Sequence, residues 1–197
     1  MISIGNDIVD LNDFDSDLET YNRRYIQRVL SESEIATFNI NLELILEREK
    51  IKSLFWRLWA AKEAAYKSLK RINSEYIFKP SEYTVSPDFS EVKYGPERAY
   101  CSYEEKKNYI HVICSNKPVQ KLFKEKKIHY LIQKCRFNDN HRDIARQKIK
   151  ADLTEIYQKE INLIFTNRIP SYIVNDNEYP VSISHHGQYV SAAAIIA

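Results

Sequence analysis

RLWAAKEAAYKSLK, residues 57–70, is the stretch from which the fold of this chain is best read. Its apolar residues continue a spacing of three to four that predicts a helix over about 50–70. The apolar face of that helix consists of Leu54, Leu58, Ala61, Ala65 and Leu69. Glu63 stands four residues before Lys67, in the order that favours an ion pair. That pair fits either a solvated helix face or one wall of a site for phosphate and metal.

Length and composition indicate a folded chain without a strong bulk charge. Of its 197 residues 44% are hydrophobic, which is enough for a core, and the net charge is +2. This near balance gives no electrostatic reason to expect nucleic acid or an anionic membrane as the partner. No apolar run approaches the roughly 20 residues of a membrane-spanning helix. Residues 1–13, MISIGNDIVDLND, lack the pattern of a signal peptide.

The three cysteines, Cys101, Cys114 and Cys135, are widely spaced and odd in number. This usage argues against a disulfide framework and against a zinc site. Together with the absence of targeting signals, it leads us to expect a soluble cytoplasmic protein.

The pattern along the chain predicts helices followed by strands, twice. Residues 18–30 and a segment opened by the capping box SESE at 31–34 predict two helices before the one at 50–70. Three short runs rich in Val, Ile, Tyr and Cys then predict an antiparallel sheet: 82–86, 98–105 and 109–115. A capped helix over 138–160 and three more strands follow: 161–167, 179–186 and 188–197. We therefore expect an α+β fold with two similar units.

Polar residues stand beside the first and the last predicted strands. ISIG, residues 2–5, predicts a strand that ends at Gly5, with Asp7 just beyond it. A carboxylate there is commonly a turn former, but together with Glu63 it would supply the hard oxygen ligands that Mg²⁺ prefers. Near the C-terminus, a strand over 179–186 would put Ser182 and Ser184 on one face and turn His185 and His186 to opposite faces. Without a G-x-S-x-G turn, the Ser-His pair does not support a Ser-His-Asp hydrolase.

The segment 120–136 suggests a second class of function. Lysines alternate there with Phe123 and Tyr130, and Phe137 follows, an arrangement that single-strand nucleic-acid binding proteins use. An amphipathic helix with a solvated face gives the same pattern. Because the chain as a whole is not strongly basic, we expect no nucleic-acid partner and keep that reading as an alternative.

Three segments in series resemble the signature set of the 4′-phosphopantetheinyl transferase superfamily. They are IGNDIVDL (4–11), FWRLWAAKEAAYKSL (55–69) and VSISHHGQYVSAAAI (181–195). QRVLSESE (27–34) is also similar to the segment between the first two motifs of holo-acyl-carrier-protein synthases. The resemblance implies transfer of 4′-phosphopantetheine from coenzyme A to a serine of an apo acyl or peptidyl carrier protein. It implies Mg²⁺, with Mn²⁺ as the alternative, and release of adenosine 3′,5′-bisphosphate.

Two alternatives remain open under this resemblance. A non-catalytic relative would bind coenzyme A or a carrier protein without transfer. Whether the carrier serves fatty acid biosynthesis, polyketide synthesis or peptide synthesis is also open.

The domain organisation that the resemblance implies is a permuted pseudodimer. Residues 1–116 resemble the second unit of the two-unit enzymes in this family, and residues 117–197 resemble the first. Each unit would be a short antiparallel sheet packed with helices, with the site in the cleft between the units. Residues 1–116 would bind metal and phosphate, and residues 117–197 the nucleotide end of coenzyme A. A monomer is expected, and a trimer on the plan of the small synthases is the alternative.

The resemblance also assigns roles residue by residue. Metal binding falls to Asp7 and Glu63, with Asp10 as an additional ligand on the plan of the small synthases. Catalysis falls to Glu63, Lys67 and Asp7. Binding of coenzyme A falls to Lys62, Lys67, Ser184, His185 and Arg142. Apart from the resemblance, Arg23, Arg24 and Arg28 on the helix after Asp7 are candidate docking charges for an acidic carrier, and a solvated surface is the equal alternative.

The sequence departs from the family pattern at two places. Val9 stands where the two-unit enzymes have a second acid, so metal binding would follow the small synthases. KSLKRINS, residues 67–74, lacks the glycine that the family usually has soon after the Lys-Glu helix. We therefore expect the loop after that helix to be built differently in this chain.

Overall fold

A computed structural model of the chain describes residues 1–13, 23–40 and 48–197. Within these ranges the strands form two five-stranded antiparallel sheets. The first has the order β1-β5-β4-β3-β2, with the strands Gly5–Asp10 (β1), Tyr83–Val85 (β2), Glu91–Tyr94 (β3), Glu97–Glu105 (β4) and Tyr109–Ser115 (β5). The second has the order β6-β10-β9-β8-β7, with the strands Ile128–Lys134 (β6), Leu163–Thr166 (β7), Ile169–Val174 (β8), Asn177–His186 (β9) and Tyr189–Ile195 (β10).

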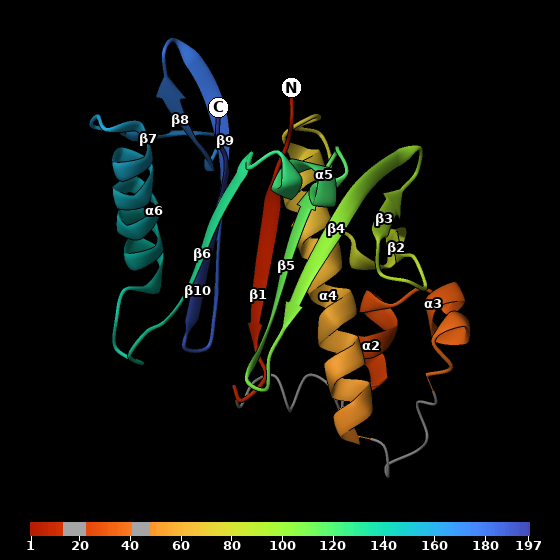
Figure 1. Cartoon of the computed structure of the whole chain (residues 1–197). Helices are drawn as coiled ribbons and strands as arrows, with labels where there is room; N and C mark the ends of the chain where they lie inside the picture. The colour runs from red at the N-terminus through yellow and green to blue at the C-terminus, as the bar shows by residue number, and fades with distance from the viewer. Residues whose placement is uncertain (14–22, 41–47) are drawn as a thin grey trace.

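The two sheets share one topology. In each, the first strand pairs with the last, and helix separates the first strand from a four-stranded meander. The described helices are Arg23–Val29 (α2), Glu32–Thr37 (α3), Arg48–Lys70 (α4), Val119–Lys124 (α5) and His141–Tyr157 (α6), with a short 3₁₀ turn at Pro80–Glu82 (η2). Helix α4 packs on the first sheet and α6 on the second (Figure 1). The predicted α+β fold with two similar units is confirmed.

The helices that were predicted from caps and spacing begin where expected. The capping box at the start of α3 is present: Ser31 Oγ accepts from Glu34 N at 3.2 Å, and Ser31 N donates to Glu34 Oε2 at 2.9 Å. Helix α6 is capped by Asn140, whose side chain accepts from the backbone N–H of Asp143. The spacing predicts that the second helix continues to 46, but α3 ends at Thr37. Residues 18–22 of the first helix prediction and 41–46 of the second lie outside the described residues.

Strand β1 was misplaced, and the strands β3, β6 and β8 were not predicted. Strand β1 begins at Gly5 rather than ending there. The prediction failed because the polar residues after Gly5 suggested a turn, whereas all six residues of β1 are buried. Strand β8 was missed because Pro170 reads as a strand breaker, although proline is tolerated near the start of a strand. Within 120–136, the structure has the short α5 and then β6 instead of one amphipathic helix. None of the described helices is long and apolar enough to cross a membrane.

Gly5 allows α4 to lie unusually close to β1. A Cβ atom at this position would stand 2.0 Å from the carbonyl oxygen of Ala64 and 2.5 Å from the nitrogen of Ser68. Both are backbone atoms of α4, so only a residue without a side chain fits there. This close approach brings the side chains of one helix turn onto the first strand.

The two sheets meet along β1, whose two edges form different kinds of hydrogen bond. One edge pairs with β5, and the backbone N–H groups of the other edge donate to side chains of β9. The bonds are Asn6 N to Ser182 Oγ (2.8 Å), Ile8 N to Ser184 Oγ (3.3 Å) and Asp10 N to His186 Nδ1 (3.1 Å). We call these three bonds the seam. They confirm that Ser182 and Ser184 share a face of their strand.

Candidate functional site

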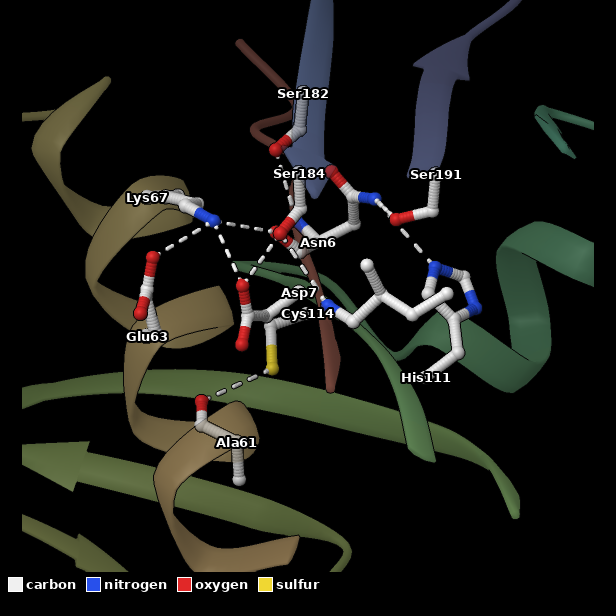
Figure 2. Close-up of polar contacts among 11 residues, drawn as sticks. Asn6, Asp7, Ala61, Glu63, Lys67, His111, Cys114, Ser182, Ser184 and Ser191 are labelled. Atoms are coloured by element: carbon white, nitrogen blue, oxygen red, sulfur yellow. Dashed lines mark hydrogen bonds and ion pairs between the residues drawn. The ribbon is translucent and has the colours of Figure 1, made fainter. Parts of the chain in front are cut away.

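The ammonium of Lys67 lies at the centre of a polar cluster built from both units. Its Nζ donates to the carbonyl of Asn6 at 3.1 Å and to Asp7 Oδ1 at 2.9 Å, and it pairs with Glu63 Oε1 at 3.0 Å (Figure 2). Ser184 Oγ, from β9, donates to the same Asp7 oxygen at 2.6 Å. The structure therefore brings Asp7, Glu63, Lys67 and Ser184 together from β1, α4 and β9.

The Glu63–Lys67 pair does not lie on an open helix face. The two side chains are only 28% and 24% exposed, and Asp7 beside them is buried. The predicted ion pair is thus confirmed. It lies in a partly enclosed wall and not on a solvated helix face.

The buried carboxylate and the ammonium affect each other's ionisation. Burial raises the pKa of Asp7 to about 7, and the charge of Glu63 acts in the same direction, while Lys67 and Ser184 oppose it. For Lys67, burial lowers the pKa, but Asp7 and Glu63 outweigh it, so the pKa is raised above its ordinary value. The ammonium therefore stays charged near neutral pH and acts as the counterion of the two carboxylates.

A pocket of about 950 Å³ opens beside this cluster. Its lining combines basic, acidic and apolar side chains from α4, α6, β7, β8, β9 and the β7–β8 turn: Glu63, Lys67, Arg142, Arg146, Phe165, Arg168, Pro170, Ile183, Ser184 and His185. This volume is near the upper end of ligand pockets, which run from about 300 to 1,000 Å³. Guanidinium groups are well suited to phosphate because they donate two parallel hydrogen bonds. The pocket fits a large ligand with several phosphates and an apolar or aromatic part.

Neighbouring groups determine the ionisation of His185 and the contacts of Arg146 in the pocket. Burial lowers the pKa of His185, and the positive charges of Arg142 and other nearby groups lower it further, which favours the neutral ring. The guanidinium of Arg146 lies 4.7 Å from the ring centre of Phe165. Its Nε is buried and has no hydrogen-bond partner among the described residues.

Lys62 does not reach the pocket, which corrects its expected contact with coenzyme A. Its side chain is fully buried, and its Nζ donates to the carbonyl of Val29 at 2.7 Å and to Glu34 Oε2 at 2.5 Å. Glu34 also accepts from the backbone N–H of Val85 at 3.0 Å. The pair therefore ties α3 and β2 to α4. A buried ammonium held in this way is not accessible to a phosphate.

Asp10 also lies apart from the Asp7–Glu63 pair. Its carboxylate accepts from the backbone N–H groups of Asn12 (2.9 Å) and Gln188 (3.0 Å) at the end of β1. Because side chains alternate along a strand, it stands on the face opposite to Asp7. The structure thus does not bring this expected ligand to the other two.

The arginines expected to dock a carrier lie on α2. Arg24 and Arg28 are exposed there. Arg23 belongs to the helix, but its side chain is outside what the structure describes.

Asp7 and Glu63 are the two carboxylates at which a divalent ion could bind. Among the described residues, no group of three or more His, Cys, Asp or Glu side chains could hold a metal. Mg²⁺ that acts on phosphates is, however, commonly held by one or two carboxylates, with water and the phosphates as its other ligands. Asp7 and Glu63 converge on one ammonium, and Asp7 Oδ2 accepts no hydrogen bond within the described ranges. This pair fits such an ion in the presence of a phosphate ligand.

Sequence reasoning missed five of the ten described pocket residues: Arg146, Phe165, Arg168, Pro170 and Ile183. Arg146 stands four residues after Arg142 on α6, so helical spacing was a usable signal for it. Arg168, in the turn between β7 and β8, and Pro170, on β8, were missed because β8 was not predicted, whereas Phe165 and Ile183 lie on predicted strands without a polar signal.

One comparison with known families finds a match. The model of the ACPS family, described as the 4′-phosphopantetheinyl transferase superfamily, matches residues 3–118. This is more than half of the chain, and it ends just after β5, the last strand of the first sheet. No curated protein matches the chain.

Proposed function

The chain belongs to the 4′-phosphopantetheinyl transferase superfamily, and we propose that it transfers 4′-phosphopantetheine from coenzyme A to a serine of an apo acyl or peptidyl carrier protein. The observation that carries this proposal is the convergence of Asp7, Glu63 and Lys67 beside a pocket rich in arginine. The reaction produces holo carrier and adenosine 3′,5′-bisphosphate. Family membership supports the transferase class, and the pocket supports a ligand with several phosphates.

The pocket residues bind and orient coenzyme A in this proposal. Arg142, Arg146 and Arg168 pair with its phosphates, and Phe165 and Ile183 contact the base. The neutral ring of His185 donates one hydrogen bond at the nucleotide end and repels no neighbouring guanidinium. Because most of these residues come from 117–197, that unit binds the nucleotide end.

The residues of α4 and β1 act on the diphosphate. Asp7 and Glu63 are the residues that would hold Mg²⁺, or Mn²⁺, which neutralises charge on the diphosphate when bound. Lys67 contributes a fixed positive charge beside the phosphoryl group, where negative charge develops during transfer. The carrier serine must lose a proton, and Glu63 is the only acid in the described lining of the pocket. We assign it the role of general base.

The proposed acceptor is an acidic carrier protein. Arg24 and Arg28 are exposed on α2 and would attract an acidic surface. Both walls of the pocket come from one chain, which supports a monomer rather than a trimer with shared sites.

Carrier labelling tests the proposal. Purified protein is incubated with coenzyme A, MgCl₂ and a panel of apo carriers from its own cell, and carrier mass is followed together with the nucleotide product. We expect one carrier to gain the mass of one phosphopantetheine group while adenosine 3′,5′-bisphosphate appears. Glu63→Gln and Lys67→Met should each slow transfer by about 10²–10³. Lys93→Met, at an exposed position of β3, serves as the matched control.

Two outcomes would contradict the proposal. Absence of a mass gain on every carrier of the cell would refute the transfer. Binding of coenzyme A without release of the bisphosphate would instead identify a non-catalytic relative.

A further inference from the structure

Arg71 follows α4 directly and bonds to backbone from both units. Its Nε donates to the carbonyl of Ile4 at 3.1 Å. Its Nη2 donates to the carbonyl of Pro170 at 2.7 Å and to the carbonyl of Val181. One guanidinium thus joins the residue before β1 to strands β8 and β9 of the second sheet.

Arg71 and two of its three carbonyl partners lie next to the two walls of the pocket. On one side, Arg71 stands four residues after Lys67, which lines the pocket from α4. On the other side, Pro170 itself lines the pocket, and Val181 stands two residues before the lining residue Ile183. The spacing between the walls is therefore coupled to the geometry of one side chain.

Arg71 has no place in the pocket lining among the described residues. Its guanidinium borders a separate hollow of about 290 Å³, which is also lined by Lys70 and Glu178. An effect of Arg71 on the ligand would thus pass through the walls and not through contact.

The bonds need the shape of this particular side chain. A guanidinium offers five N–H donors in a planar fork, whereas a lysine ammonium offers three donors from one point on a flexible stem. The three carbonyls come from separate segments, so a single ammonium is poorly placed to serve all of them. The loop that carries Arg71 is also the one that lacks the family's usual glycine, and a glycine would supply none of these side-chain donors.

We propose that Arg71 is a positioning residue that sets the distance between the two walls of the coenzyme A pocket. Together with the seam, it holds β8 and β9 against β1 and the end of α4. Its loss lets the walls separate and weakens coenzyme A binding, although the residue does not touch the ligand. The coenzyme A part of this inference rests on the proposed function above.

The first test measures binding and kinetics in Arg71→Gln and Arg71→Lys. The dissociation constant of coenzyme A is measured by calorimetry, and kcat and both KM values by carrier labelling. We expect Arg71→Gln to raise the Kd and KM for coenzyme A at least tenfold, with Arg71→Lys in between and the KM for the carrier changed less than twofold. Arg98→Gln and Arg98→Lys are the matched controls, because Arg98 is 55% exposed on β4 and pairs with Glu91 within the first sheet.

The second test needs no ligand. Hydrogen exchange is compared between the wild type and Arg71→Gln at the seam amides of Asn6 and Ile8 and at the amides of β4 and β5 inside the first sheet. We expect faster exchange at the seam and unchanged exchange within the sheet. A general loss of stability would instead accelerate both sets.

The outcomes separate the two proposals. If the wild type neither binds coenzyme A nor labels a carrier, the proposed function fails and the coenzyme A part of this inference fails with it, while the exchange data still decide whether Arg71 holds the walls. If the wild type binds coenzyme A but Arg71→Gln binds it equally well, the positioning role is refuted. Uniform acceleration of exchange would also refute it.

Discussion

Replacing Gly5 with alanine adds one methyl group where α4 lies on β1. The new Cβ would stand 2.0 Å from Ala64 O and 2.5 Å from Ser68 N, and both distances are far below an ordinary contact. These atoms belong to the backbone of a helix, so they cannot rotate away as a side chain would. Helix and strand must separate, by more than about 1 Å, before the methyl group fits.

The expected cost is at the upper end for overpacking. Extra methyl groups in well-packed cores usually cost about 1–3 kcal/mol, and here two rigid backbone atoms are displaced at once, so we expect about 3 kcal/mol or more. A protein of this size unfolds with about 5–15 kcal/mol. The melting temperature should fall by at least about 6–12 °C, at about 2–4 °C for each kcal/mol. The same displacement draws Lys67 away from Asp7, so any remaining folded protein should also transfer more slowly.

Urea unfolding and thermal melting measure the loss, with Gly95→Ala as the matched control. Gly95 also gains one methyl group, but no atom lies within 4 Å of the new Cβ, and the only strain comes from its φ of +55°. That conformation costs about 1–2 kcal/mol for a residue with a side chain. If Gly5→Ala loses no more stability than Gly95→Ala, the close approach of α4 to β1 is not what Gly5 is needed for, and the reasoning fails.

Three further predictions follow from buried or exposed charges. Lys62→Met leaves the buried carboxylate of Glu34 without its counterion, so the free energy of unfolding in urea should fall by about 3–5 kcal/mol. The folded variant should keep the wild-type Kd for coenzyme A. A weaker Kd would show that Lys62 does contact the ligand. Burial lowers the pKa of His111 to about 3. Below pH 6.5 the unfolded chain therefore binds a proton at this residue that the folded chain does not bind. This difference should lower the free energy of unfolding by about 2–3 kcal/mol between about pH 7.5 and 4.5. His111→Gln should remove that part of the acid sensitivity in paired urea titrations, and an unchanged pH profile would show that the ring is protonated in the fold. Reversing Arg24 and Arg28 to glutamate should raise the KM for the carrier and leave the KM for coenzyme A unchanged, in rates compared at low and high salt, whereas an unchanged carrier KM would place docking elsewhere.

The helices were predictable because their signals are local. Helix α4 has a continuous apolar face, and α6 has an asparagine cap, so each could be found from neighbouring residues alone. The polar strand β1 could not be found in this way. Its buried Asn6, Asp7 and Asp10 each have a hydrogen-bond partner on β9, about 176 positions away, and a pattern of neighbouring residues cannot reveal such a contact.

The site residues were predicted correctly where three separate motifs occur together in the sequence. The prediction failed where two neighbouring residues of one helix were given the same role. Asp7, Glu63, Lys67 and Ser184 were chosen because their three motifs occur together, and the structure brings them into contact. Lys62 was placed with them because the resemblance gives both lysines beside Glu63 the same role. Successive helix residues point about 100° apart, however, and this turn directs Lys62 into the core while Glu63 lines the pocket.

The seam explains how two sheets can lie edge to edge and still enclose a pocket. If β9 paired with β1 through backbone bonds, the two sheets would merge, and Ser184 would stand perpendicular to the joint sheet. Its hydroxyl would then not reach the edge of β1. Because β9 instead presents side chains to that edge, Ser184 Oγ accepts from Ile8 N and donates to Asp7 Oδ1 with the same oxygen. The hydroxyl that makes one of the three seam bonds therefore also orients the Asp7 carboxylate, so Ser184→Ala should weaken the seam and the orientation of Asp7 together.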